Sequence, residues 1–218
     1  MAPHAPEATG MTYLLLLGAY VLGSVSGSLL LGSLRGVDIR TLGSGNAGGT
    51  NALRTQGPAF ALGTVVVDVG KGVLAAWLAL RLLPPAAHPA WADACVLAAM
   101  AGHVWPLFHR FRGGKGAATL VGGLAVIWPP GLLLVVAVWL LTLSWSGYVG
   151  LATVLAGLSL LPMAVLSDAD AWRLAFSGSA SALLLYTHRA NLARLRAGTE
   201  PRSERARVLG RLLSRRDG

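Results

Sequence analysis

The chain has 218 residues, of which 54% are hydrophobic and 12% charged, with a mean hydropathy of +0.61. So little polar surface excludes a soluble globular protein of this length and indicates a polytopic membrane protein. The net charge of +9 is concentrated in arginines near the C-terminus, without interleaved aromatic residues, so that stretch predicts a cytoplasmic tail on the membrane surface and excludes a nucleic-acid site.

Seven apolar segments follow one another along the chain, and we expect each to form a transmembrane helix. The first, residues 11–34, would span about 36 Å, which is enough to cross the hydrocarbon core. The two prolines after Trp128 should divide the long apolar stretch beyond Gly116, because proline removes a backbone donor and disfavours helix in the residue before it. Residues 144–147 should form a turn. The other expected helices cover about residues 60–83, 90–108, 115–127, 130–143, 148–166 and 171–186.

The distribution of basic residues predicts the orientation. Lysine and arginine gather in residues 35–54, in residues 110–115 and after residue 189, whereas the alternate connections carry none, so the basic connections should be cytoplasmic. Seven crossings then place the N-terminus outside and the C-terminus in the cytoplasm. The fold class expected is all-α, in one integral membrane domain, and five spans with a re-entrant hairpin is the alternative because the fourth and fifth helices are short. The parts expected are an outer flexible tail (1–10), a transmembrane domain (11–188) and a basic cytoplasmic tail (189–218).

The first polar motif, residues 43–54, reads Gly-Ser-Gly-Asn-Ala-Gly-Gly-Thr-Asn-Ala-Leu-Arg and lies between two apolar segments. Glycines allow the backbone to approach a ligand closely, successive N–H groups in such turns form an anion nest, and Arg54 adds a guanidinium fork. The motif therefore predicts a phosphate-binding loop beside the membrane. A polar glycine-rich linker is the alternative interpretation.

The second motif, residues 102–119, is basic and rich in glycine, and its Gly-Gly-Lys-Gly sequence precedes an apolar helix. A helix N-terminus combines unpaired N–H groups with the positive end of the dipole, and Lys115 adds an ammonium at the same point, which favours a phosphoryl group. It is not a Walker A loop, because Lys115 is followed by Gly116 and not by serine or threonine. For Arg110 and Arg112, a positive-inside loop without a substrate role is equally compatible.

The third motif, residues 188–200, follows the last apolar segment. If the helix continues, His188, Asn191 and Leu192 share a face; taken alone, the motif would indicate only a basic interfacial segment. Inside the second apolar segment, Asp68 and Lys71 lie three residues apart and are expected to pair. An ion pair is costly in a membrane, which suggests that it lines the site, although a structural pair is the alternative.

Together the three motifs resemble those of the bacterial PlsY family, the acyl-phosphate:glycerol-3-phosphate acyltransferases of the inner membrane. The family patterns Gly-Ser-Gly-Asn-x-Gly-x-Thr-Asn-x-x-Arg, Gly-His-x-x-Pro-x-Phe with Phe-x-Gly-Gly-Lys-Gly, and His-Arg-x-Asn-x-x-Arg-Leu with a later Gly-x-Glu are met at residues 43–54, 102–116 and 188–200. Gly49, Ala117 and Leu192 depart mildly from the usual residues and leave the polar positions untouched. The resemblance implies seven transmembrane helices.

The resemblance further implies transfer of a fatty acyl group from acyl phosphate to the 1-hydroxyl of sn-glycerol 3-phosphate, giving lysophosphatidic acid and phosphate. A membrane transporter of an organic phosphate is the alternative. The base would be His188, His103 or a phosphate oxygen of the donor. No cofactor or metal is implied; the partners are both substrates, the lipid bilayer and, as a candidate, the enzyme that makes acyl phosphate. The expected catalytic residues are Ser44, Arg54, Lys115 and His188, and the expected substrate-binding residues are Gly43, Asn46, Thr50, Asn51, Asp68, Lys71, His103, Gly113, Gly114, Gly116 and Asn191.

Overall fold

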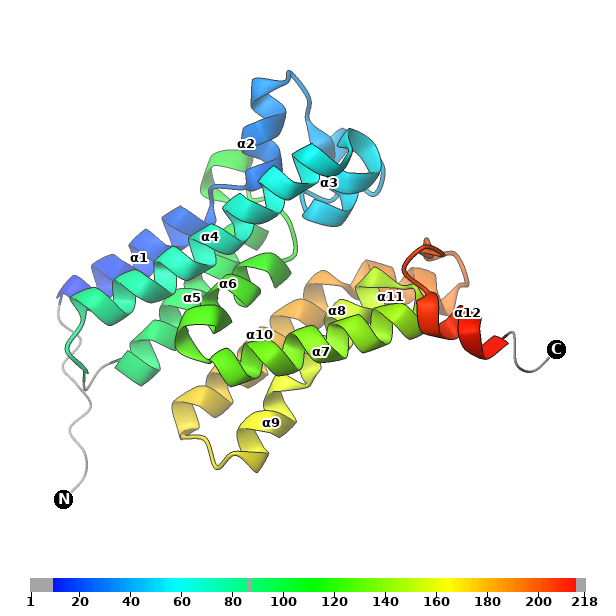
Figure 1. Cartoon of the computed structure of the whole chain (residues 1–218). Coiled ribbons are helices and arrows are strands. Elements are labelled where there is room, and N and C mark those ends of the chain that lie inside the picture. Colours follow the sequence, from blue (N-terminus) through cyan, green and yellow to red (C-terminus); the bar gives the residue numbers. More distant parts are fainter. Residues whose placement is uncertain (1–9, 86–87, 215–218) are drawn as a thin grey trace. The chain divides into compact units, whose positions relative to one another are not determined.

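The computed structural model describes residues 10–85 and 88–214, and these are helical with short connections (Figure 1). Apart from Gly10, the expected outer tail lies outside the described residues. The chain divides into two compact units at Trp128, the residue before two prolines. Pro129 begins a new helix there, one residue before the predicted start at residue 130, because proline tolerates the first helical position but not the interior.

In the first unit, the long helix α4 packs against α1, α2, α3, α5 and α6, and α1 also packs along α5. Figure 1 shows α1, α4 and α5 running side by side, with α2 and α3 at one end. The elements are α1 (Gly10–Gly23), α2 (Gly27–Leu34), η1 (Ile39–Thr41), α3 (Gly49–Gln56), α4 (Pro58–Leu82), α5 (His88–Val104), η3 (Leu107–His109) and α6 (Ala117–Ile127).

The first apolar segment is not one straight helix, which corrects the expectation of a continuous helix over residues 11–34. It breaks after Gly23, and α1 and α2 meet at an angle of 48°. A break leaves backbone groups without helical partners, which is costly away from water. Here α4 supplies the partners: Lys71 donates to the carbonyls of Gly23 and Val25, and Asp68 accepts from the N–H of Gly27.

In the second unit, α8 packs against α7, α10 and α11, and α10 also contacts α9. The expected turn at residues 144–147 is wrong for its first three residues, because α7 continues through Ser146. The hydroxyls of Ser144 and Ser146 donate to carbonyls of their own helix, so the serines do not interrupt it, and Gly147 ends it at a φ of +76°. The elements are α7 (Pro129–Ser146), α8 (Val149–Leu158), α9 (Leu160–Leu166), α10 (Ala171–Thr187), α11 (Arg189–Arg196) and α12 (Val208–Ser214).

Within the described residues, four helical stretches are long and apolar enough to cross a membrane, and the bent α1–α2 pair makes a fifth. The four are Pro58–Leu82, Ala90–His109, Pro129–Ser146 and Val149–Leu166, the last combining α8 and α9. The apolar helix α6 and the 17-residue α10 are shorter. The predicted total of seven crossings therefore stays a prediction.

Candidate active site

The loop of the first motif is held by the buried side chain of Asn51. Its carboxamide oxygen accepts from the N–H of Ser44 at 3.0 Å, and its nitrogen donates to the carbonyls of Ile39 and Leu42. Asn51 is 2% exposed. Its hydrogen-bonding capacity thus serves the loop itself, so we treat it as a positioning residue and not as a substrate contact.

Gly43 has a φ of +56°, and a Cβ there would collide with the oxygen of Asn51, so both the backbone and the space require glycine. Residues 49–56, expected as part of a loop, form the short helix α3. Ser44, Thr50 and Arg54 are exposed around this turn, and Asn46 is half-buried. Of the predicted residues in this motif, these four are the ones whose side chains are open to a ligand.

Replacing Asn51 by alanine should lower the free energy of unfolding by about 2 kcal/mol, because three hydrogen bonds vanish and backbone groups lose their partners. Thermal unfolding in detergent would measure the loss. Thr50→Ala, at the exposed neighbouring position, is the control and should unfold at the wild-type temperature. Equal midpoints of thermal unfolding for the two variants would show that the hydrogen bonds of Asn51 do not stabilise the loop.

Three ionisable side chains form a buried cluster at the break in the first segment. Asp68, Lys71 and His103 are each less than 5% exposed. The expected pair of Asp68 and Lys71 is present, with 3.3 Å between the carboxylate oxygen and the ammonium. Nδ1 of the third member, His103, lies 2.6 Å from the ammonium of Lys71 and 3.4 Å from Oδ1 of Asp68. The ammonium also donates to the carbonyls of Gly23 and Val25.

Lys71 and Asp68 thus bind main-chain groups at the break, which favours the structural alternative for this pair over a substrate-binding role. His103 contacts the side chains of both.

The glycines of the second motif pack against that cluster. A Cβ on Gly114 would collide with Nε2 of His103, and one on Gly113 with the carbonyl of His103. The N–H groups of Gly113 and Gly114 donate to the carbonyls of Val104 and His103. The sequence predicted that these two glycines bind substrate. Their N–H groups are instead bonded to protein carbonyls, and the absence of side chains allows close packing.

Gly116 and Lys115 lie at the start of α6, as predicted. Gly116 is the N-cap, with a φ of +86°, and Lys115 is half-buried directly before it. The N–H groups in the first turn of a helix have no helical acceptors. An ammonium beside that turn makes this the better phosphate-binding point of the motif.

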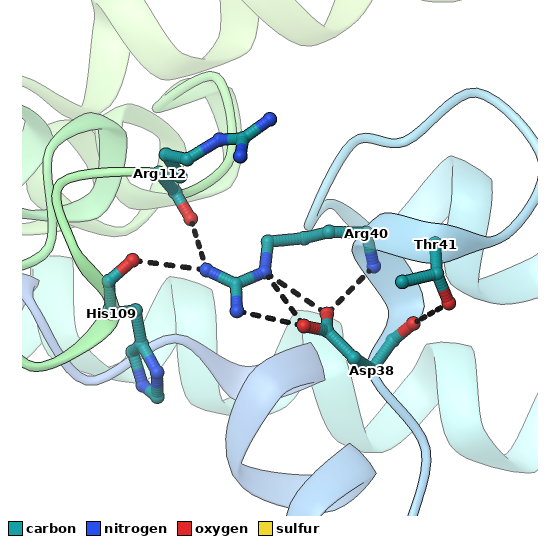
Figure 2. Close-up of polar contacts among 5 residues, drawn as sticks. All are labelled: Asp38, Arg40, Thr41, His109 and Arg112. Atoms are coloured by element: carbon teal, nitrogen blue, oxygen red, sulfur yellow. Dashed lines mark hydrogen bonds and ion pairs between the residues drawn. The ribbon is translucent and has the colours of Figure 1, made fainter.

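One residue that joins the two loops lies outside all three motifs and was missed. Arg40 pairs with Asp38 through Nε and NH2, and its NH1 donates to the carbonyls of His109 and Arg112 at 2.9 and 3.1 Å (Figure 2). In the sequence analysis Arg40 contributed only to the positive charge of residues 35–54, from which the orientation in the membrane was predicted. Its acceptors are backbone atoms far along the chain, for which the sequence carries no signal.

The hydrogen bonds from the Arg40 side chain and backbone lower the pKa of Asp38 from 3.8 to about 2. A carboxyl group whose pKa is lower in the folded than in the unfolded protein stabilises the folded state at pH values above the unfolded pKa. For Asp38 this stabilisation is lost as the pH falls from about 4 through 2. We therefore expect the difference in stability between wild type and Asp38→Asn to shrink over this window. Unfolding followed by tryptophan fluorescence at each pH measures it, and a difference that stays constant would contradict the ion pair.

In the second unit, His188 links α10 to α11. Its Nδ1 lies 2.9 Å from the carbonyl of Leu184, which only accepts, so Nδ1 carries the proton and a neutral ring has its lone pair on Nε2. Asn191 and Arg194 both donate to Glu200, whose side chain is 6% exposed. Glu200 thus links two side chains of α11 and orders this motif, and residues 189–196 continue helically after His188.

Comparisons with known proteins identify the family to which the chain belongs. The profile of the glycerol-3-phosphate acyltransferase family matches residues 13–198. The chain belongs to this family. Glycerol-3-phosphate acyltransferases of Geotalea daltonii and Pseudomonas paraeruginosa are 40% and 42% identical over 186 and 195 residues, which cover 85% and 87% of this chain and 94% and 98% of theirs.

A crystal structure of PlsY, an integral membrane glycerol 3-phosphate acyltransferase, in its glycerol 3-phosphate form is similar in fold and 33% identical in sequence. Its TM-score is 0.84, over 92% of this chain and 99% of that one. The lysophosphatidic acid form matches with a TM-score of 0.82 at 32% identity. This member of the glycerol-3-phosphate acyltransferase family is therefore a multi-pass membrane protein.

The predicted site residues thus fall into two kinds. Ser44, Thr50, Arg54, Asn46 and Lys115 are exposed or half-buried. Asn51, Asp68, Lys71 and His103 are buried and contact neighbouring protein atoms. Both kinds carry polar atoms, so sequence alone did not separate candidate ligand contacts from positioning residues.

Proposed function

We propose that this protein transfers a fatty acyl group from acyl phosphate to the 1-hydroxyl of sn-glycerol 3-phosphate. It is a membrane glycerol-3-phosphate acyltransferase, the first enzyme of phospholipid synthesis in this scheme. The observation that carries the proposal is the pair of polar loops in the first unit, each leading into a helix N-terminus and each with a basic side chain, in a chain of this family.

The donor is the finer part of the proposal. An acyl phosphate and glycerol 3-phosphate each carry a phosphate, and two phosphate sites would account for two glycine-rich loops that each have a cation nearby, Arg54 in the last turn of α3 and Lys115 directly before α6. We assign the acyl phosphate to Lys115, Gly116 and the first turn of α6. Ser44, Asn46, Thr50 and Arg54 are assigned to glycerol 3-phosphate and the reacting carbonyl.

His188 and Asn191 are proposed to take part in substrate binding, and this role rests on the resemblance of their motif to that of the family. The tautomer of His188 favours acceptance of a hydrogen bond at Nε2. Asn191, whose amide nitrogen donates to Glu200 at 2.6 Å, is fixed in orientation by that bond.

The reaction needs no covalent acyl-enzyme, because an acyl phosphate is a mixed anhydride with a good leaving group. The 1-hydroxyl oxygen attacks the carbonyl carbon, the bond from that carbon to the phosphate oxygen breaks, and inorganic phosphate leaves. The hydroxyl proton passes to a phosphate oxygen of the donor, which gains basicity as the bond breaks. Lys115 and the N–H groups of α6 stabilise the charge on the departing phosphate.

The topology that goes with this proposal has seven crossings in the bacterial inner membrane. They are the bent α1–α2 pair, α4, α5, α6, α7, the α8–α9 pair and α10. The positive-inside distribution then places the motifs on the cytoplasmic side, where a soluble phosphorylated substrate is available. The enzyme that makes acyl phosphate is the proposed partner.

Phosphate release from synthetic palmitoyl phosphate by the purified protein in lipid, with and without glycerol 3-phosphate, tests the function. We expect release that depends on glycerol 3-phosphate, with an equal amount of lysophosphatidic acid by mass spectrometry. A parallel reaction with palmitoyl-CoA tests the donor and should give no product. If folded protein yields neither product while glycerol 3-phosphate crosses sealed vesicles, the transporter interpretation replaces this one.

A further inference from the structure

Arg40 is the side chain through which the segment before the first motif contacts the second motif. One edge of its guanidinium, Nε and NH2, faces both carboxylate oxygens of Asp38 at 2.8 to 3.2 Å. NH1 extends past the ion pair to two backbone carbonyls of the second loop (Figure 2). Arginine suits this position because its planar fork can hold a carboxylate on one side and donate on the other.

Asp38 is also held by hydrogen bonds that do not involve the Arg40 guanidinium. Its carboxylate accepts from the backbone N–H of Arg40 and caps η1, and its carbonyl accepts from the hydroxyl of Thr41. The Asp38–Arg40 pair therefore presents NH1 from a short, ordered turn. We call this pair the latch.

The two carbonyls that accept from the latch flank a strained turn. Arg110 and Phe111 have φ values of +55° and +56°, in the left-handed region that residues other than glycine rarely adopt. The acceptors, His109 and Arg112, lie on either side of these two residues. Gly113 follows directly, so the turn leads straight into the Gly-Gly-Lys-Gly sequence.

The first loop has its own supports and does not need the latch. Asn51 holds it through three hydrogen bonds, and the hydroxyl of buried Ser28 donates to the carbonyl of Ala47 at 2.9 Å. Loss of Arg40 should therefore release the second loop while the first keeps its shape.

We propose that Arg40 is a positioning residue for the acyl-phosphate donor: it fixes the turn at residues 109–112 and thereby the place of Lys115 relative to the first loop. This inference rests on the proposed function, in which Lys115 contacts the donor phosphate. Its specific consequence is a selective effect on one of the two substrates.

Steady-state kinetics of Arg40→Ala test this. We expect the KM for palmitoyl phosphate to rise about tenfold, since two hydrogen bonds from a charged donor are lost, while the KM for glycerol 3-phosphate changes by less than about twofold. Arg40→Lys keeps the charge but cannot span carboxylate and carbonyls, so it should stay closer to alanine than to wild type.

Arg35→Ala is the matched control, because Arg35 belongs to the same connection and stacks on Phe60 without reaching the second loop. It should keep wild-type values for both substrates. Asp38→Asn provides a second variant should Arg40→Ala fold poorly, and it should raise the same KM less. Combined with Arg40→Ala it should add little, because both changes open one latch.

Equal effects of Arg40→Ala and Arg35→Ala, or an equal rise in both KM values, would overturn the positioning role. Inactive wild-type protein would count against the proposed function and not against the latch. In that case, exchange of the amide hydrogens in residues 110–116 still decides: it should be faster in Arg40→Ala than in Arg35→Ala, and equal rates would overturn the inference.

Discussion

Replacing Lys71 by methionine should destabilise the first unit by about 3–5 kcal/mol, the cost of leaving a buried charge without its partner. The variant strands Asp68 and also leaves the carbonyls of Gly23 and Val25 without a donor in an apolar region. Methionine has nearly the same length as lysine, so a change in packing contributes little. We expect the unfolding midpoint to fall by roughly 10 °C.

Cys95 provides the measurement, because it is 1% exposed and is the only cysteine in the sequence. A thiol-reactive dye therefore becomes fluorescent only when the first unit opens. Asp68→Asn is the informative comparison: its amide oxygen still accepts from Gly27, and Lys71 still donates to the carbonyls of Gly23 and Val25, so the loss should be clearly smaller. If Lys71→Met unfolds at the wild-type temperature, the buried cluster does not stabilise the break between α1 and α2.

The other lysine should behave in the opposite way, since Lys115→Ala is expected to abolish most activity while the protein remains folded. Lys115 lies before the first turn of α6, where it would meet the charge that develops on the departing phosphate. Loss of one such group typically costs about 10² to 10³ in kcat. Phosphate release from palmitoyl phosphate in the presence of glycerol 3-phosphate measures the effect.

The controls separate chemistry from folding. Lys115→Ala should melt within a few degrees of wild type in the Cys95 assay, and Lys115→Arg, which keeps a cation at this point, should recover part of the rate. Activity of Lys115→Ala within about threefold of wild type would remove this residue from the site.

Local signals in the sequence were sufficient for much of the helical arrangement. Apolar length located the long helix α4, Pro129 marked the boundary after Trp128, and Gly116 marked the start of α6. Each of these depends on a residue and its immediate neighbours, which is what a sequence pattern can report. The three motifs identified the family for a similar reason, because their residues are contiguous.

Features that depend on distant partners were not predictable. The break at residues 24–26 contains no proline, and its stability comes from side chains of α4. Likewise, Gly113 and Gly114 look like phosphate-binding glycines, yet their N–H groups reach carbonyls that only the folded turn brings near. Arg40 was missed for the same reason, since its acceptors are main-chain atoms of a remote loop.

The break between α1 and α2 also constrains how the protein is made. The first segment leaves the ribosome before α4 exists, so the unpaired carbonyls of Gly23 and Val25 and the N–H of Gly27 must at first find water or an accessory factor. Only when α4 enters the bilayer do Lys71 and Asp68 arrive to bond these groups, and His103 of α5 then contacts both of these side chains. We therefore expect chains that stop before His103 to remain at the translocon or be degraded, which would make insertion of this half of the enzyme a concerted event among three helices.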